Sequence, residues 1–470
     1  MPLNSKPLRV LLVPDSIYWV TGTIAKSIAR FNPWIEATIA SGPIIDAIFP
    51  ERPELIQNFD LVHFICPYSS RRWLPQFRDF VPCVTSHHHV TDWEAVSHNL
   101  EGDAIMAGSS EWAEDLRNRG ADMSRVFAVP YGVDADAFRP PAEAERAMVR
   151  ARLKIPDGTI VIGFFGKNSS NDNDRKGIDV FTEAVVELNR SIHQLSVLIV
   201  GPGWKALVNS LRAAGVSCLW RPFVASQDEL ARMYHALDFY WVTARVEGGP
   251  VTLLEAMSSE VCCLATPVGL AREIVRDGEN ALLLPFNDAG AFTERTASLI
   301  DNAEERARLG HAARKTILEE MHVGITAQRV REVYAKALSV ARKRLTEERF
   351  DIIGIDANSF DMAGSFDMAG SFELAGRLAA VPNEIPLSGF PNEIHARVRM
   401  LEAMAWSEHL ILYHRQRAVA LKLIARAWMK NPFSLLPPRV MLRRFMPTRV
   451  VQAVVRLKNG AQPKLKELPG

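Results

Sequence analysis

Short apolar runs alternate with amphipathic stretches along most of the chain. The runs at residues 8–14, 60–67 and 104–109 are almost continuously apolar, which is typical of strands buried in a parallel sheet. Helical spacing appears between several of these runs, as in SEWAEDLRNRG, where Ser110 is the expected N-cap and Gly120 the expected stop. This alternation predicts a doubly wound α/β domain.

A second series of the same kind opens near residue 158. TIVIGFFG, LSVLIVGPG, DFYWVTA and VCCLATPVG indicate strands, and helical patterns such as FTEAVVELNRSI and PVTLLEAMSSE lie between them. We therefore expect two tandem Rossmann-like domains, residues 1–140 and 141–324, joined by a proline-bearing connection near residues 138–147. A helix at residues 325–345 is expected to cross back to the first domain.

The rest of the chain differs in composition. Residues 346–385 are expected to be a linker and contain SFDMAG SFDMAG SFELAG, whose six-residue unit is too short to form a core. Residues 386–470 are expected to be a basic helical tail. From His409 onward, thirteen Lys and Arg residues accompany the single acid Glu467, so this segment carries +12 and the remainder −11. Such a tail either packs on the acidic body or binds anionic lipid headgroups.

The overall composition is that of a soluble globular protein. Of 470 residues, 48% are hydrophobic and 23% charged, and the net charge of +1 predicts no nucleic-acid partner. The sequence has no apolar run of about eighteen residues and no signal-peptide core at its start. We expect a cytoplasmic protein, with the tail as a peripheral contact to the inner face of the plasma membrane. Five cysteines in apolar runs, without a CxxC pair, predict buried reduced thiols: Cys66, Cys83, Cys218, Cys262 and Cys263.

Two glutamates in EGGPVTLLEAM mark the expected site. Glu247 follows the predicted strand DFYWVTA, at the carboxyl edge of the sheet where such folds bind ligands. Glu255 lies five residues into the next helix, about 7.5 Å along its axis, which disfavours a glycosidase-like pair acting on one bond. On the residues alone, an ordinary turn glutamate and an exposed helix glutamate are an equal alternative. Gly248 and Gly249 would let the backbone approach a ligand closely, and Pro250 suits the first turn of the helix, where its missing N–H costs nothing. Free N–H groups for a phosphate are expected from Gly249 and from Val251 onward.

With this motif, the chain resembles the GT-B glycosyltransferases of the large retaining family that includes glycogen synthase, sucrose synthase and bacterial mannosyltransferases. The signature of that family is a glutamate, seven residues and a second glutamate. Three more blocks resemble the family in the same order: VPYGVDADAFRP, GFFGKNSSNDNDRKGIDVFTEAV and PVGLAREIVRDGENALLLP. The resemblance covers roughly residues 8–340.

The resemblance implies roles for the charged residues. Glu255 would accept hydrogen bonds from the donor ribose, and Glu247 would contact the transferred sugar near its reacting face. Lys167 and Lys176 match the basic pair that binds the diphosphate, with Arg175 as a competitor for the same role. An ammonium group there would neutralise charge on the departing phosphate, and each such hydrogen bond contributes about 1.5–3 kcal/mol. The alternative for the lysines is a solvated loop.

Further correspondences concern the first domain. His87, in VTSHHHVT, matches a histidine that lines the family's active site, and Gly22 matches a glycine-rich loop that approaches the diphosphate. Neighbouring histidines on a strand point to opposite faces, so this run does not predict a metal. The DxD-like triplets at residues 134–136 and 172–174 fall in expected turns, where turn chemistry is the better interpretation. We expect no metal and no cofactor.

The chain also departs from the family pattern. A single glycine, Gly22, stands where a pair is usual, Lys167 replaces an arginine, and Leu270 and Ala281 replace glycines. The expected function is that of a retaining, metal-independent hexosyltransferase, which moves a sugar from a nucleoside diphosphate sugar to a hydroxyl of a glycan, a lipid-linked acceptor or a small molecule. The alternative is a catalytically inactive scaffold that binds nucleotide sugars and is anchored by the basic tail.

Overall fold

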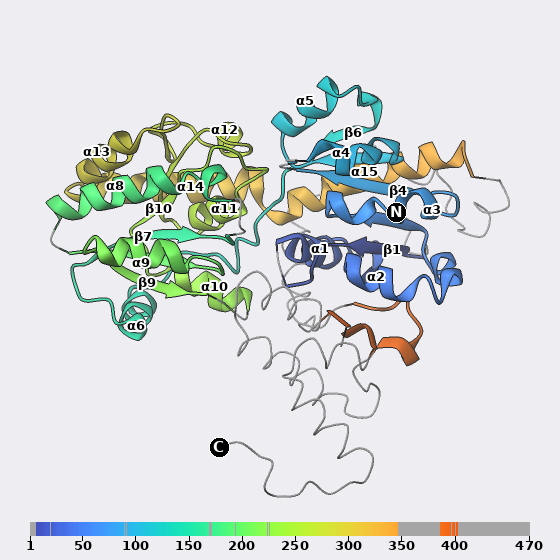
Figure 1. Ribbon diagram of the computed structural model, residues 1–470, viewed down its shortest axis with the longest axis horizontal. Helices are drawn as coiled ribbons and strands as arrows, with labels where there is room; N and C mark the ends of the chain where they lie inside the picture. Colours follow the sequence, from blue (N-terminus) through green and yellow to red (C-terminus); the bar gives the residue numbers. More distant parts are fainter. Residues whose placement is uncertain are drawn as a thin grey trace, which may run out of the picture. The chain divides into compact units, whose positions relative to one another are not determined.

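The computed structural model describes residues 6–345, with gaps at 19, 89, 91, 169–171, 193, 223 and 225, and residues 386–402 without 396 and 400. The chain divides into two units, Met1–Phe390 and Pro391–Gly470. The first unit carries both expected domains (Figure 1). The expected linker repeats and the basic segment after His409 lie outside the described residues.

The first half of this unit is a six-stranded parallel sheet in the order β2-β1-β3-β4-β5-β6. Its strands are β1 Leu8–Val13, β2 Ile35–Ile39, β3 Leu61–Phe64, β4 Cys83–His87, β5 Ala104–Ala107 and β6 Val126–Ala128. Its helices are α1 Val20–Phe31, α2 Gly42–Ile48, α3 Leu74–Phe77, α4 Trp93–Val96 and α5 Ser110–Asn118, with short 3₁₀ turns η1 Pro53–Asn58, η2 Pro67–Ser70, η3 Ser97–Glu101 and η4 Met123–Arg125.

The second half repeats this architecture in the order β12-β11-β10-β7-β8-β9, again with parallel neighbours. Its strands are β7 Ile160–Phe165, β8 Leu195–Val200, β9 Ser217–Arg221, β10 Phe239–Val242, β11 Cys262–Ala265 and β12 Leu282–Leu283. Its helices are α6 Glu143–Leu153, α7 Asp172–Arg175, α8 Ile178–Ser191, α9 Lys205–Ala213, α10 Gln227–Tyr234, α11 Val251–Ser258, α12 Ala271–Ile274, α13 Ala289–Ile300 and α14 Ala303–Thr316, followed by the π-helical turn η5 Ile317–Met321.

Helices cover both faces of the second sheet because its strands are apolar on both sides. Neighbouring residues of β10 contribute to different cores: Tyr240 packs with α11 residues, and Trp241 packs with Phe181 of α8 and Phe292 of α13. Two separate hydrophobic clusters result, one on each face. All five cysteines are buried and unbridged. No helix among the described residues combines the length and the apolar character that a membrane span requires.

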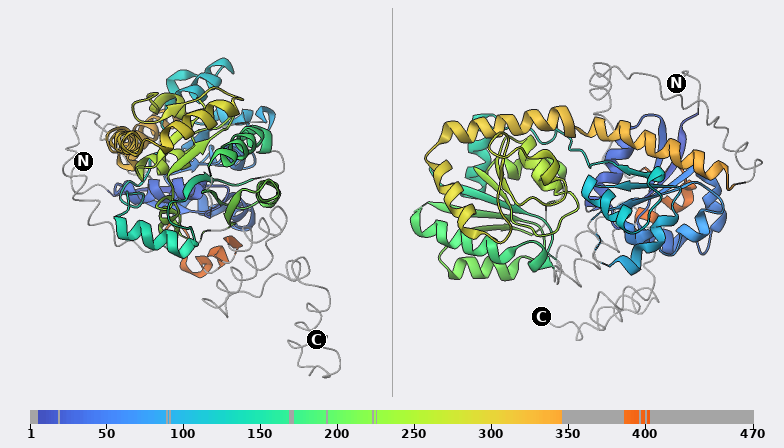
Figure 2. Two further views of the ribbon diagram at one scale, coloured as in Figure 1. Left: turned by 90° about the vertical axis from the view of Figure 1, so that its left-hand side faces the viewer. Right: turned by 90° about the horizontal axis from the view of Figure 1, so that it is seen from above.

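The helix α15 Val323–Arg342 follows the second sheet in sequence but packs on the first. Val330 and Tyr334 lie in the core of the first sheet, and α15 contacts α1, β4 and β5. Just beyond its end, Arg344 pairs with the buried Asp103 at 2.8 Å. In the right-hand view of Figure 2, α15 (orange) runs from the second half along the first.

One expected helix cap was wrong, and one strand was missed. The N-cap of α5 is Ser109, whose extended backbone lets its hydroxyl accept the Trp112 N–H at 3.3 Å, and not Ser110. The N–H of Ser110 donates instead to Glu273 at 2.6 Å. Strand β2 was not predicted, although it pairs with β1 along five residues.

The segment at residues 386–390 packs beside β2, the edge strand of the first sheet. The Ile39 N–H donates to the Pro386 carbonyl at 2.8 Å, and the Gly389 N–H donates to the Thr38 hydroxyl at 2.7 Å. Phe390 is buried with its ring against Phe49 and Phe59. This segment therefore covers polar backbone groups that an edge strand otherwise exposes.

Candidate functional site

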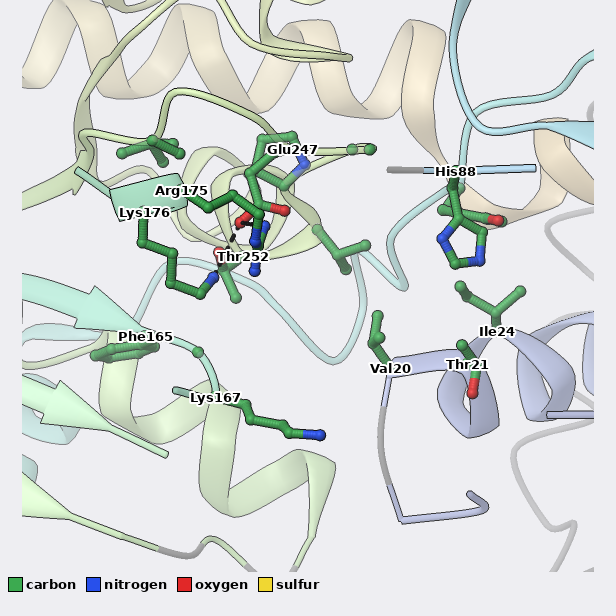
Figure 3. A pocket seen from close by; sticks show the side chains of 18 of the residues that line it. Val20, Thr21, Ile24, His88, Phe165, Lys167, Arg175, Lys176, Glu247 and Thr252 are labelled. Carbon is green, nitrogen blue, oxygen red and sulfur yellow. Dashed lines mark hydrogen bonds and ion pairs between the residues drawn. The ribbon is translucent and has the colours of Figure 1, made fainter. Parts of the chain in front are cut away.

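A cavity of about 300 Å³ lies at the carboxyl ends of strands from both sheets. The second half supplies the loop after β7, the end of α7, and the turn between β10 and α11; the first half supplies α1, η2 and the loop after β4. Figure 3 shows Lys167, Arg175, Lys176 and Glu247 on the side of this cavity that the second half forms. The lining includes Thr21, Tyr68, His88, Tyr131, Lys167, Arg175, Lys176, Glu247, Gly248, Gly249, Pro250 and Val251.

Glu247 holds two cationic groups at this cavity. Its Oε1 atom lies 2.9 Å from Nζ of Lys176 and 2.9 Å from an Nη atom of Arg175, and Figure 3 shows both head groups converging on the carboxylate. All three side chains are 15–16% exposed, so the charges are shielded from bulk water but reachable from the cavity. Such half-buried pairs interact more strongly than surface pairs.

The backbone explains why these charges meet. The Thr243 hydroxyl, just after β10, donates to the Lys176 carbonyl at 3.0 Å, and the Arg245 N–H donates to the Arg175 carbonyl at 2.7 Å. Gly177 adopts φ +62°, and a Cβ atom there would collide with the Thr243 carbonyl. The loop before α8 therefore needs glycine at this position to lie against the end of β10.

Lys167 is on the same wall but in a different place. It follows Gly166 at the end of β7, and its amino group points into the cavity away from Glu247 (Figure 3). Gly166 and Gly201 pack backbone to backbone, because a Cβ on Gly201 would collide with the Gly166 carbonyl. The two predicted lysines thus approach one cavity from two loops, and Arg175 shares the carboxylate with Lys176.

The turn Gly248–Val251 borders the cavity as expected, with one difference at its end. Pro250 occupies the N-cap position of α11 and not its first turn, and its carbonyl accepts the Leu253 N–H at 2.7 Å. Helix α11 therefore begins at Val251 at the cavity wall, where its first N–H groups have no intrahelical acceptor. An anion bound here would meet the positive end of the helix.

Glu255 does not line this cavity. It is 6% exposed and accepts a hydrogen bond from the Tyr234 hydroxyl at 2.6 Å. Burial raises the pKa of Glu255 to about 7, and the hydrogen bond from Tyr234 opposes that rise. The predicted contact with a ribose stays a prediction, and it requires a carboxylate that currently pairs with Tyr234.

The structure places two predicted residues of the first half away from the cavity. His87 is fully buried, with Nε2 3.0 Å from Asp115, and its neighbour His88 faces the cavity (Figure 3). Gly22 lies in α1, where a Cβ would collide with the backbone at Ser16 and Ile17, so its contact is with that turn and not with the cavity. The strand alternation that separates His87 from His88 was stated from the sequence, and the predicted role of His87 stays a prediction.

Aromatic residues of the first half were missed altogether. Tyr68 in η2 is 44% exposed and lines the cavity, and Tyr131 lies beside His88 with ring centroids 5.8 Å apart. Tyr131 stands inside the block VPYGVDADAFRP, which did signal this region. Nothing in the sequence around Tyr68 indicated its position.

The acidic triplet at residues 134–136 forms a turn. The Asp134 carboxylate accepts the N–H groups of Asp136 and Ala137 at 3.2 Å and pairs with Arg30 at 2.8 Å. Among the described residues, no group of three or more His, Cys, Asp or Glu side chains could hold a metal ion.

The sequence of the second half matches a known family model. Residues 147–316 match the family Glycosyl transferases group 1. The resemblance to these glycosyltransferases is thereby confirmed. This group 1 segment contains the glutamate motif, Lys167, Arg175 and Lys176. A D-inositol 3-phosphate glycosyltransferase of Xylanimonas cellulosilytica is 33% identical over 221 residues, which are 45% of this chain and 52% of that protein.

One further relative and two solved structures are also similar to this chain. A putative glycosyltransferase of Bacillus subtilis, EpsD, is 25% identical over 236 residues, 49% of this chain and 59% of its own. The chain spans about half the length of the curated relatives it matches. Anabaena HepE, solved with UDP and glucose, has a TM-score of 0.59 at 16% identity and covers 70% of this chain and 99% of its own. Sucrose-phosphate synthase of Thermosynechococcus elongatus has a TM-score of 0.56 at 15% identity, covering 71% and 99%. These likenesses confirm the predicted GT-B fold.

Proposed function

We propose that this protein is a retaining glycosyltransferase that moves a sugar from a nucleoside diphosphate sugar to an acceptor hydroxyl. The observation that carries the proposal is the pairing of Arg175 and Lys176 with Glu247 at a cavity between two Rossmann-like sheets. Two cations beside a helix start suit a diphosphate, and a carboxylate beside them suits a sugar. The group 1 segment supports the same reaction class.

In this proposal the charged residues act on the donor. Arg175, Lys176 and Lys167 bind the diphosphate and stabilise the negative charge that grows as the bond between the anomeric carbon and the phosphate oxygen breaks. The acceptor oxygen forms its new bond on the same face of the sugar, and its proton passes to the departing phosphate. Glu247 orients the sugar and balances developing positive charge without forming a covalent intermediate.

The acceptor is proposed to enter from the wall formed by the first half. Tyr68, His88 and Tyr131 line that wall opposite the cationic groups, and aromatic rings combined with a hydrogen-bonding imidazole suit a polyhydroxylated acceptor. A glycan or a polyol therefore fits the chemistry of this wall. No observation favours the inactive scaffold, because the side chains that the reaction needs converge on one cavity.

UDP-glucose is the first donor to test, because the fold relative HepE was solved with UDP and glucose. We expect the protein to release UDP from UDP-glucose in the presence of an acceptor. Glu247→Ala should lower this turnover by at least about 100-fold, a loss within the range for removing a group that stabilises transition-state charge, while binding of UDP is largely retained. Glu294→Ala, an exposed glutamate of α13, is the matched control. Equal turnover of Glu247→Ala and the control would refute the assignment.

A further inference from the structure

The first turn of α5, in the first half, contacts the Glu247 loop of the second half. The indole N–H of Trp112 donates to the backbone carbonyl of Glu247 at 3.2 Å. One residue earlier, the Glu111 carboxylate accepts the backbone N–H of Gly269 at 2.9 Å. In the second half, both hydrogen bonds are made by main-chain atoms, the Glu247 carbonyl and the Gly269 N–H. They therefore constrain the backbone of this region and not only a flexible side chain.

Gly269 belongs to the same contact because it lies directly against the Glu247 loop. Its φ is +45°, and a Cβ there would lie 2.5 Å from the Glu247 carbonyl oxygen and 2.8 Å from the Gly248 carbonyl oxygen. Glu111 therefore binds the backbone at Gly269, which packs against the Glu247 loop, while Trp112 binds the loop itself. The two side chains thus bind two neighbouring backbone segments of the second half.

A third hydrogen bond at this junction uses a carboxylate of the second half. Glu273, in α12 of the second half, accepts the N–H of Ser110 at 2.6 Å. Ser110 is the first residue of α5, so this carboxylate satisfies a free N–H group and interacts favourably with the helix start. Each half thus donates and accepts at the same junction.

The indole of Trp112 is held in place from within the first half. Trp112 is buried and its ring packs edge-on against His87, with centroids 5.6 Å apart. His87 is fixed in turn by Asp115, one turn further along α5, which also pairs with Arg119. The buried His87 therefore supports the side chain that reaches Glu247.

We propose that the first turn of α5 is a positioning clasp for the Glu247 loop, with Trp112 and Glu111 as its positioning residues. The clasp couples the orientation of Glu247 to the contact between α5 and the second half. It rests on the proposed function only for its effect on turnover; the contact itself is independent of the reaction. His87 acts through Trp112 and not on substrate.

Hydrogen exchange measured by mass spectrometry tests the clasp without any substrate. Trp112→Phe keeps an aromatic ring and removes the N–H, and Glu111→Ala removes the acceptor. Trp112→Phe should accelerate exchange in the peptide covering residues 245–252, and Glu111→Ala in the peptide that contains Gly269, each by roughly 2-fold to 10-fold, as expected from the loss of one hydrogen bond. Glu111→Gln, which keeps an acceptor oxygen, should restore the slow exchange. Glu114→Ala, on the same helix and paired with Arg117, is the control and should change nothing at the loop.

Turnover of UDP-glucose provides the second readout. Trp112→Phe should lower kcat by roughly 10-fold with less than about a 2-fold change in KM, since a misplaced catalytic group affects the transition state more than ground-state binding. Unchanged exchange in Trp112→Phe and Glu111→Ala overturns the clasp, as does faster exchange with an unchanged kcat. If the native protein does not turn over UDP-glucose, the exchange result still decides the clasp, and the failure counts against the proposed donor alone.

Discussion

The buried pair of Glu255 and Tyr234 gives a prediction about stability and pH. Burial raises the pKa of Glu255 from its ordinary 4.5 to about 7 in the folded protein. Between these values the folded state binds more protons than the unfolded state, so the free energy of unfolding falls as pH rises. The stabilising contribution of the neutral carboxyl is fully present below pH 4.5 and is lost as pH rises through about 7.

The size of this effect follows from the difference between the two pKa values. At about 1.4 kcal/mol per pKa unit, ionising the buried carboxyl costs about 3 kcal/mol by pH 8. Glu255→Gln removes the ionisation, and its amide oxygen can still accept the Tyr234 O–H. We therefore expect this variant to gain stability relative to the native protein as pH rises, by about 2.5 kcal/mol between pH 5 and pH 8.

Urea denaturation at a series of pH values, without ligand, is the assay. The difference in free energy of unfolding between Glu255→Gln and the native protein should grow from pH 5 to about pH 7 and level off towards pH 8. Glu294→Gln, on the exposed face of α13, should stay parallel to the native protein. Parallel curves for Glu255→Gln would show that Glu255 titrates normally and would refute the reasoning.

Two substitutions test the packing around the site. Gly177→Ala should destabilise the protein by at least about 2 kcal/mol in urea denaturation, because alanine disfavours φ +62° and its Cβ collides with the Thr243 carbonyl. Gly120→Ala, with φ +82° and open space around the added Cβ, should cost about 1 kcal/mol. Equal losses of stability in the two variants would contradict the clash at Gly177. Phe390→Ala should lower the free energy of unfolding by about 3–5 kcal/mol if its buried ring holds residues 386–390 on β2, and proteolysis in that segment should become faster. The control is Phe286→Ala, which truncates an exposed ring. Equal behaviour of the two variants would argue against a role of Phe390 in holding this segment.

The repeated pattern of apolar runs was sufficient to predict both sheets, because parallel strands buried on two faces are conspicuous in sequence. Strand β2 escaped because IEATI carries the exposed Glu36 at the sheet edge and is only partly apolar. For a related reason, the positions of His87 and His88 relative to the cavity could not be read from the sequence. Every residue of β4 is buried, so alternation of polar and apolar positions carried no information about which histidine faces the cavity.

The charged residues of the site could be predicted from the sequence, but their contacts with one another could not. The motif placed Glu247 at a strand end, yet its pairing with Arg175 and Lys176 depends on a contact 71 residues away in sequence. The pairing of Glu255 with Tyr234 and the contact of Trp112 with Glu247 are likewise tertiary. Such contacts leave no local periodicity, so spacing alone could not reveal them.

In the proposed function, Lys176 and Arg175 beside Glu247 form the binding site for a nucleoside diphosphate. Isothermal titration of UDP against Lys176→Met tests this claim, with Lys205→Met on the exposed face of α9 as the control. We predict that Lys176→Met weakens UDP binding roughly 10-fold to 100-fold, as expected from the loss of one charge-assisted hydrogen bond, while Lys205→Met binds UDP like the native protein. Equal UDP affinity in the native protein and Lys176→Met would contradict the claim.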